Sequence, residues 1–187
     1  MKKVEVIQMA TKELLNLDTN KATHIITSYY PFQIQQRFSR NYTIYQKMKV
    51  FIQDGFIDRY TGDKLVIPGI LKILSTYFPK EFPYQKNWKM TECHVAYWEL
   101  TPTVDHLYPI ARGGEDKEEN WITTSMLHNS IKSNWTLEEV GWKLHDRGDL
   151  KEWDGLTNEF ITLVKRDEEL LKDSYIRDWY NAVVKYS

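Results

Sequence analysis

Residues 104–135, VDHLYPIARGGEDKEENWITTSMLHNSIKSNW, decide what the middle of this chain folds into. Residues 103–108 have the pattern of a short strand, and residues 121–124 predict a second one. Gly113–Gly114 indicates a tight loop between them, since glycine tolerates backbone angles that other residues avoid. Helix-like apolar spacing resumes at about Ser125. The stretch therefore predicts a β-hairpin followed directly by a helix.

The sequence on either side of this stretch is mainly helical in pattern. Apolar spacing predicts helices at residues 4–17, 43–54, 157–173 and 174–186, a helix beginning at Pro68, and a capping box at 136–139. Residues 79–90 are expected to form a loop, residues 92–100 a short helix or extended piece, and residues 22–41 give no clear assignment. The predicted fold class is α+β, with a small hairpin-and-helix unit embedded in a mostly helical single domain.

The bulk composition is that of an ordinary globular protein. The 187 residues include 42% hydrophobic and 27% charged residues, and the formal net charge is −1. No apolar run approaches the roughly 20 residues needed to span a bilayer, and the N-terminus lacks the pattern of a signal peptide. The single cysteine, Cys93, excludes an intramolecular disulfide. We therefore expect a cytoplasmic protein that makes no use of a membrane.

The residue types in the central stretch suit phosphodiester hydrolysis. A water molecule must lose a proton near neutral pH, which suits a histidine, and the charge on the phosphate needs a hard cation with oxygen ligands. Asp105 and His106 are adjacent on the predicted strand, so their side chains point to opposite faces. Asn129, on the following helix, can bring its amide oxygen to the metal ion that Asp105 holds.

The motifs of this stretch resemble those of the HNH endonucleases, the ββα-metal nucleases. The shared pattern is a DH pair, a proline, a GG pair, Asn120 fourteen residues after His106, and N-x-x-K beginning nine residues further on at Asn129. The resemblance implies His106 as general base, Asp105 and Asn129 as ligands of Mg²⁺ or Mn²⁺, Asn120 as a clamp on the loop, and Lys132 on the phosphate. Arg112 has two readings, as a phosphate contact or as an ordinary loop residue.

A second part of the family's pattern is altered in this chain. Many members of the family carry two Cys-x-x-Cys pairs that bind a structural zinc ion. The resemblance places Asp58 and Thr61 at the first pair and Ser125 and His128 at the second. Such a set is a poor zinc site, which normally uses thiolates and imidazoles, so no structural zinc is expected. His128 then aligns with a lost zinc ligand, and Asn129 takes the catalytic position.

Three regions are expected along the chain. Residues 1–49 form a largely helical N-terminal extension, residues 50–150 the nuclease domain, and residues 151–187 the C-terminal helices. Within the nuclease domain the ββα core covers about 103–135, and residues 63–102 form an insertion.

The expected function is metal-dependent hydrolysis of DNA, with 5′-phosphate and 3′-hydroxyl products, in restriction or phage defence. The near-neutral charge counts against tight unaided binding of DNA. One alternative is an HNH-shaped binding or assembly subunit that is active only with a partner protein, and it predicts a large apolar patch on residues 157–186. Another is a nuclease that acts on RNA or on a particular nucleic-acid structure. One ββα site cuts one strand. Cleavage of both strands in one binding event would therefore need a homodimer.

Overall fold

The computed structural model describes residues 1–32 and 42–186, which fall into two compact units. The first unit covers residues 1–37 and the second covers residues 38–187. The boundary lies earlier than the expected one at residue 49, because the helix before residue 54 packs against the central hairpin. The C-terminal helices belong to the second unit as well, since they share its core.

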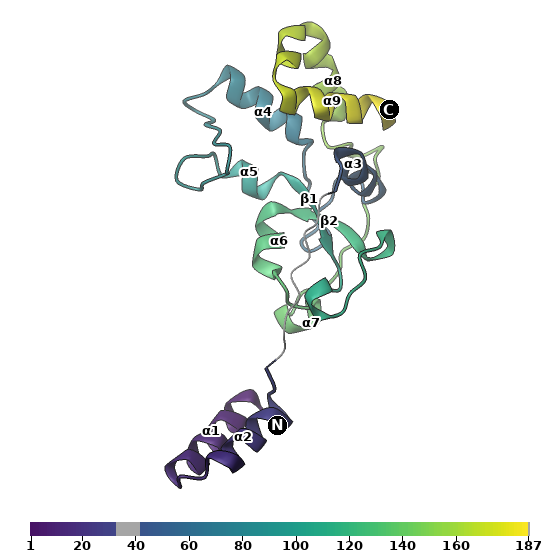
Figure 1. Cartoon of the computed structure of the whole chain (residues 1–187). Helices are drawn as coiled ribbons and strands as arrows, with labels where there is room; N and C mark the ends of the chain where they lie inside the picture. The colour runs from purple at the N-terminus through teal and green to yellow at the C-terminus, as the bar shows by residue number, and fades with distance from the viewer. Residues whose placement is uncertain (33–41, 187) are drawn as a thin grey trace. The chain divides into compact units, whose positions relative to one another are not determined.

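The first unit is a helical hairpin of α1 (Lys3–Leu15) and α2 (Thr19–Tyr29) (Figure 1). The Asp18 side chain caps α2 by accepting a hydrogen bond of 2.9 Å from the Lys21 backbone. The two helices bury a small core of Val6, Ala10, Ala22 and Ile25. The sequence did not predict α2, because its threonines interrupt the apolar spacing.

The centre of the second unit is an antiparallel pair of strands, β1 (Pro102–His106) and β2 (Trp121–Ser125). His106 pairs with Trp121 and Asp105 with Ile122. Alternation along the strands places His106 and Trp121 on one face and Asp105 on the other, as the sequence predicts.

Two helices pack against the hairpin (Figure 1). α6 (Met126–Lys132) follows β2 without a loop, and the Ser125 side chain caps it by accepting from the His128 backbone. α3 (Ile44–Gln53) approaches from a distant part of the chain, and Thr123 donates to the Val50 carbonyl of α3. The predicted hairpin and the helix that follows it are both present.

Shorter and C-terminal helices complete the second unit. They are α4 (Pro68–Tyr77), α5 (Ala96–Glu99), η1 (Ile110–Arg112), η2 (Glu118–Asn120), α7 (Leu137–Val140), α8 (Thr157–Arg166), η3 (Glu168–Lys172) and α9 (Ser174–Tyr186). The Pro68 helix start and the capping box at Thr136 are confirmed. In the described part of the chain, no helix is both long enough and apolar enough to cross a membrane.

The main core joins the hairpin to the C-terminal helices. Val104 of β1 and Phe51 of α3 belong to the same buried cluster as Phe160 of α8 and Trp179 of α9. The single helix expected at 157–173 is wrong, because α8 ends before Asp167, whose side chain accepts from the Glu169 backbone and begins η3. The core therefore holds β1 against α3, α8 and α9.

Candidate active site

The imidazole of His106 lies in a cluster of polar side chains on the α3 side of the hairpin. His106 Nε2 is 2.8 Å from Asp116 Oδ1 and 3.0 Å from the Tyr42 hydroxyl. That hydroxyl donates to the same carboxylate oxygen at 2.8 Å, and Trp121 Nε1 donates to it at 2.8 Å. Asp116 comes from the loop between the strands and Tyr42 from the residues before α3, so the hairpin alone does not build this cluster.

This cluster encloses the His106 ring. The side chain of His106 is 2% exposed, whereas that of Asp116 is 47% exposed. Tyr42 and Asp116 occupy the Nε2 edge of the ring, so this edge is closed to substrate in the structure. Asp116 connects the buried ring to the surface of the loop.

The carboxylate of Asp105 lies on the opposite face and is also buried. Its Oδ2 accepts hydrogen bonds of 2.6 Å from the Tyr60 hydroxyl and 2.8 Å from Lys132 Nζ. Lys132 Nζ donates to the His106 carbonyl at 2.8 Å as well. Burial, followed by the negative charge of Asp105, raises the pKa of Tyr60 far above its ordinary value, so this phenol stays protonated and donates.

Lys132 corrects one prediction from the sequence. It was expected to face the phosphate, but its side chain is fully buried and its ammonium is bound to Asp105 and to the His106 carbonyl. A buried carboxylate needs a partner of opposite charge, and Lys132 is that partner for Asp105.

Asn129 lies on the same side of α6 as Lys132, three residues earlier, where side chains of a helix are neighbours. Lys132 reaches Asp105, so this side of α6 faces the carboxylate. Within residues 42–186, neither Asp105 Oδ1 nor the Asn129 amide has a hydrogen-bond partner. Two oxygen donors of this kind suit Mg²⁺ or Mn²⁺, which leave their other positions to water and phosphate.

Asn120 clamps the loop that connects the strands. Its Oδ1 accepts from the Tyr108 backbone at 2.8 Å, and its Nδ2 donates to the carbonyls of Tyr108 and Glu115 at 2.9 Å each. The Asn120 carbonyl also accepts from the Leu107 backbone. These are the backbone contacts that the resemblance implies, and they fix the chain that follows His106 and the chain that carries Asp116.

Arg112 is held at the end of the same loop. Its Nη2 is 3.4 Å from a carboxylate oxygen of Glu139, and its guanidinium lies over the Trp135 ring, 5.4 Å from the centroid. These contacts tie the loop to α7 and favour the structural reading of Arg112 over a free phosphate contact.

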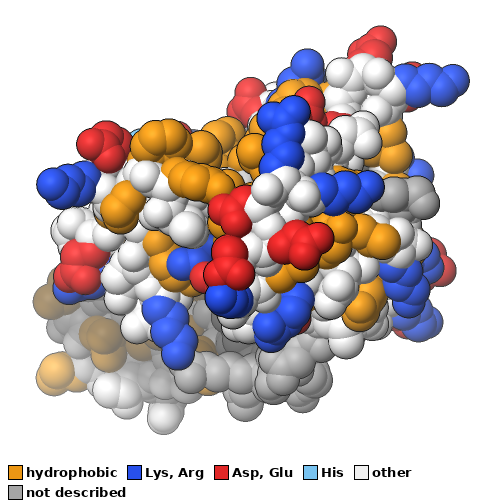
Figure 2. All heavy atoms as spheres, turned by 90° about the horizontal axis from the view of Figure 1, so that it is seen from above, with side chains coloured by type: hydrophobic (Ala, Val, Ile, Leu, Met, Phe, Trp, Pro, Cys, Tyr) orange, Lys and Arg blue, Asp and Glu red, His pale blue; other side chains and the backbone are white. Residues whose placement is uncertain are grey.

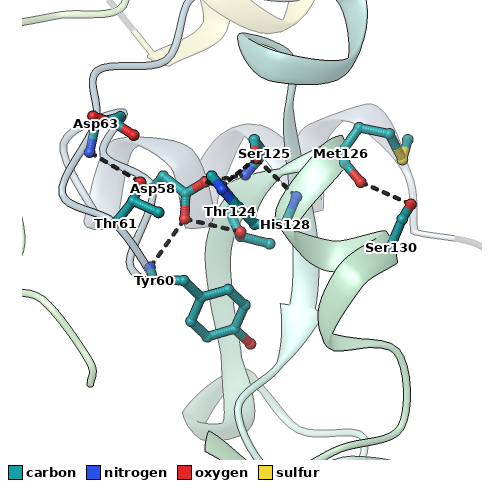
Figure 3. Close-up of polar contacts among 9 residues, drawn as sticks. All are labelled: Asp58, Tyr60, Thr61, Asp63, Thr124, Ser125, Met126, His128 and Ser130. Atoms are coloured by element: carbon teal, nitrogen blue, oxygen red, sulfur yellow. Dashed lines mark hydrogen bonds and ion pairs between the residues drawn. The ribbon is translucent and has the colours of Figure 1, made fainter. Parts of the chain in front are cut away.

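Asp58, at one of the altered cysteine positions, is the centre of a hydrogen-bonded cluster (Figure 3). Its Oδ1 accepts from the Tyr60 backbone and the Thr124 hydroxyl, both at 2.9 Å. Its Oδ2 accepts from the Ser125 backbone at 2.8 Å and from His128 Nδ1 at 2.7 Å. One buried carboxylate thus joins the turn after α3 to β2 and α6.

The other three altered cysteine positions, Thr61, Ser125 and His128, differ in their contacts. The Ser125 hydroxyl lies 2.9 Å from His128 Nδ1, so these two positions meet at Asp58. The Thr61 hydroxyl instead accepts from the Asp63 backbone at 3.3 Å, within its own turn. His128 is therefore held in a structural contact.

The Asp58→Asn substitution is expected to lower the free energy of unfolding by about 1–3 kcal/mol. The amide nitrogen takes the place of one carboxylate oxygen, so the two donors that faced this oxygen then face another donor. Burial acts to raise the pKa of Asp58, but hydrogen bonds from Ser125, His128 and Tyr60 outweigh it and lower the pKa below 3.8. The contribution is therefore present at neutral pH and is lost as the pH falls below about 4. Urea unfolding at pH 7 measures it, with the exposed Asp63→Asn as control; equal stability of the two variants would contradict the role of the cluster.

A second buried carboxylate, Asp54, was not found from the sequence. Its Oδ1 accepts from Arg59 Nη1 at 2.6 Å and from Arg147 Nε at 3.1 Å, and its Oδ2 accepts from the Thr123 backbone at 2.7 Å. It secures the turn after α3 to β2. Asp116, Tyr42 and Tyr60 were also missed, and the one local signal was the position of Asp116 in the loop between the strands.

Comparison with known proteins gives no match. No protein-family model, no curated protein and no solved structure matches this chain. Among the described residues, no three side chains of His, Cys, Asp or Glu gather in a group that could hold a metal ion. Asp105 and Asn129 are not such a group, because they are two residues and one of them contributes an amide oxygen.

Proposed function

We propose that this protein is a metal-dependent endonuclease that hydrolyses phosphodiester bonds of DNA through a ββα-metal site. The observation that carries the proposal is the arrangement around the end of β1. Asp105 and His106 lie on opposite faces of the strand, and Asn129 lies three residues before Lys132, whose ammonium reaches Asp105 from α6. Asn120 clamps the loop that follows His106. The motif resemblance implies a base, a metal ligand and a clamp at these positions, and this supports the proposal.

Each residue has a separate task in the proposed reaction. His106 accepts the proton of the attacking water, since imidazole changes charge near neutral pH. Asp105 and Asn129 hold Mg²⁺ or Mn²⁺, which when bound stabilises negative charge on the phosphate and on the leaving oxygen. Access of water to His106 requires displacement of the Tyr42 or Asp116 side chain, because these groups cover its Nε2 edge.

The distribution of charge fits a nuclease of modest affinity for DNA. Figure 2, a view from the side of α8 and α9, shows lysine and arginine side chains interspersed with aspartate and glutamate. This face therefore offers no continuous basic surface of the kind that duplex binding uses. The net charge of −1 agrees with this. Few phosphate contacts release few counterions, so the activity should fall only gradually with salt.

A second candidate function is an assembly subunit that acts only with a partner. It predicts a large apolar patch on residues 157–186. Among the large hydrophobic residues of that segment in the described chain, Val184 and Tyr186 are the exposed ones, at 48% and 41%. The others contribute to the main core, for example Phe160 and Trp179. The exposed apolar surface is too small to favour this alternative.

The proposal is tested with supercoiled plasmid in low salt. We expect the purified chain to convert it to the open-circular form with Mg²⁺ or Mn²⁺ and to leave it intact with EDTA. A structured RNA of similar length serves as the second substrate. Absence of nicking with every metal ion, or equal nicking in EDTA, would reject the proposal, and faster cleavage of the RNA would replace DNA as the substrate.

A further inference from the structure

The helical hairpin of the first unit has a very small core. Two of its four buried residues are alanines, and helices of 13 and 11 residues are marginal in water by themselves. Folding units below about 40 residues usually need a disulfide, a metal ion or oligomerisation. The single cysteine, Cys93, lies in the second unit, and the described residues of the first unit include no group of three possible metal ligands. Of these three means, oligomerisation is the one that the hairpin can use.

Both helices carry a stripe of uncharged residues outside this core. The residues of each stripe are three or four positions apart, which is the spacing of the contact positions in coiled coils. All eight residues are exposed, and none of them carries a charge. On α1 they are Val4, Ile7, Thr11 and Leu14, and on α2 and its C-cap they are Thr19, Thr23, Ile26 and Tyr30.

One contact shows that the two stripes lie on the same side of the hairpin. Lys3 Nζ lies over the Tyr30 ring, 5.7 Å from its centroid. Lys3 is one helical turn before Ile7, so this contact places the Ile7 side of α1 beside the end of the α2 stripe. An ion pair of 2.9 Å between Glu13 and Lys21 joins the helices elsewhere. The two stripes therefore form one surface, which we call the uncharged face.

We propose that two copies of this chain associate through the uncharged face, so that two hairpins form a four-helix bundle. A two-fold axis lets the same face serve both copies, and helices with this spacing pack side by side in such bundles. A face without charges offers nothing to an acidic or basic partner, whereas it matches a second copy of itself.

Two further features of the hairpin are compatible with this pairing. The Thr23 hydroxyl donates to the Thr19 carbonyl at 2.9 Å, so its hydrogen keeps a partner when the face is covered. Residues 1–32 contain four lysines and three acidic residues, so two hairpins have little net charge to keep them apart. The association does not depend on the proposed nuclease activity.

The mass of the full chain in solution tests this proposal. Sedimentation equilibrium in EDTA, without nucleic acid, should show a mass that rises with concentration to twice 22.4 kDa. The double variant Ile7→Gln with Leu14→Gln should need at least about 10-fold higher concentration to associate, because glutamine keeps the helix but removes apolar surface at two positions that are 49% and 50% exposed. The matched control is Met9→Gln, which changes a 41% exposed residue one turn before Glu13 and should associate like the wild type.

Three results would overturn the dimer. They are a wild type that stays monomeric at about 200 µM, a mass that grows beyond two copies, and a double variant that associates as strongly as Met9→Gln. Thermal unfolding of the second unit should be unchanged in both variants, because its core contains no residue of the hairpin. Since the mass is measured without metal ion or nucleic acid, failure of the dimer leaves the nuclease proposal standing, and failure to nick plasmid leaves the dimer standing.

Discussion

Alanine in place of His106 is expected to lower the rate of plasmid nicking by about 10²–10⁴-fold, the usual contribution of a general base. Imidazole is the side-chain group best suited to take a proton from water near neutral pH, and Asp105 on the other face of β1 is paired with Lys132. The measurement is the single-turnover rate of open-circle formation with saturating Mn²⁺.

The matched control is His24→Ala, which removes an exposed histidine of α2 in the first unit. It should nick at the wild-type rate. Since the His106 ring is buried, the melting temperature of His106→Ala must be recorded, and the rate compared well below it. A folded His106→Ala protein that nicks as fast as His24→Ala would show that His106 is not the base.

The second large effect is expected from Lys132→Met, which removes the cation from a buried ion pair. Methionine keeps most of the side-chain volume but leaves the Asp105 charge with only the Tyr60 hydroxyl as a partner. Loss of one partner of a buried pair costs about 3–5 kcal/mol. For a protein of this size, each kcal/mol lowers the melting temperature by roughly 2–4 °C. Thermal unfolding in EDTA measures the loss, and the exposed Lys143→Met serves as control.

The same variant tests the metal-binding proposal for Asp105 and Asn129. Without the Lys132 ammonium, a divalent cation near Asp105 meets less repulsion. The unpaired carboxylate is then stabilised more by a bound cation than it is in the wild type. We therefore expect Mn²⁺ to raise the melting temperature of Lys132→Met by more than that of the wild type or of Lys143→Met. An additional Asn129→Ala substitution should reduce the difference. Equal shifts in all of these proteins would count against a metal ion at Asp105.

The proposed site depends on two kinds of contact. Asn120 and the Ser125 cap act within the hairpin and its helix, so they follow from sequence positions a few residues apart. Asp54 and Asp58 instead join the turn after α3 to β2 across 69 and 67 residues. The sequence shows that the cysteines of a zinc site are absent, but it does not show which contacts replace them.

Lys132 illustrates why a motif is a limited guide to a side chain. Its position in the pattern predicted a phosphate contact, but its direction is set by the packing of α6 on β1, which places the ammonium 2.8 Å from Asp105. The burial of His106 has the same origin, because Tyr42 reaches it from 64 residues away. Neither outcome could be predicted from residues 104–135 alone.

The sequence by itself determined the local structure: two strands joined by a loop, the helix that follows at Ser125, the Pro68 helix start and the capping box at Thr136. These features depend on backbone preferences and hydrogen bonds between residues close in the chain. Only the tertiary structure decided the partners of His106, Asp105 and Lys132, which come from loops and helices 10 to 64 residues away. Buried polar groups must find partners in space, and those partners depend on how the helices pack around the hairpin.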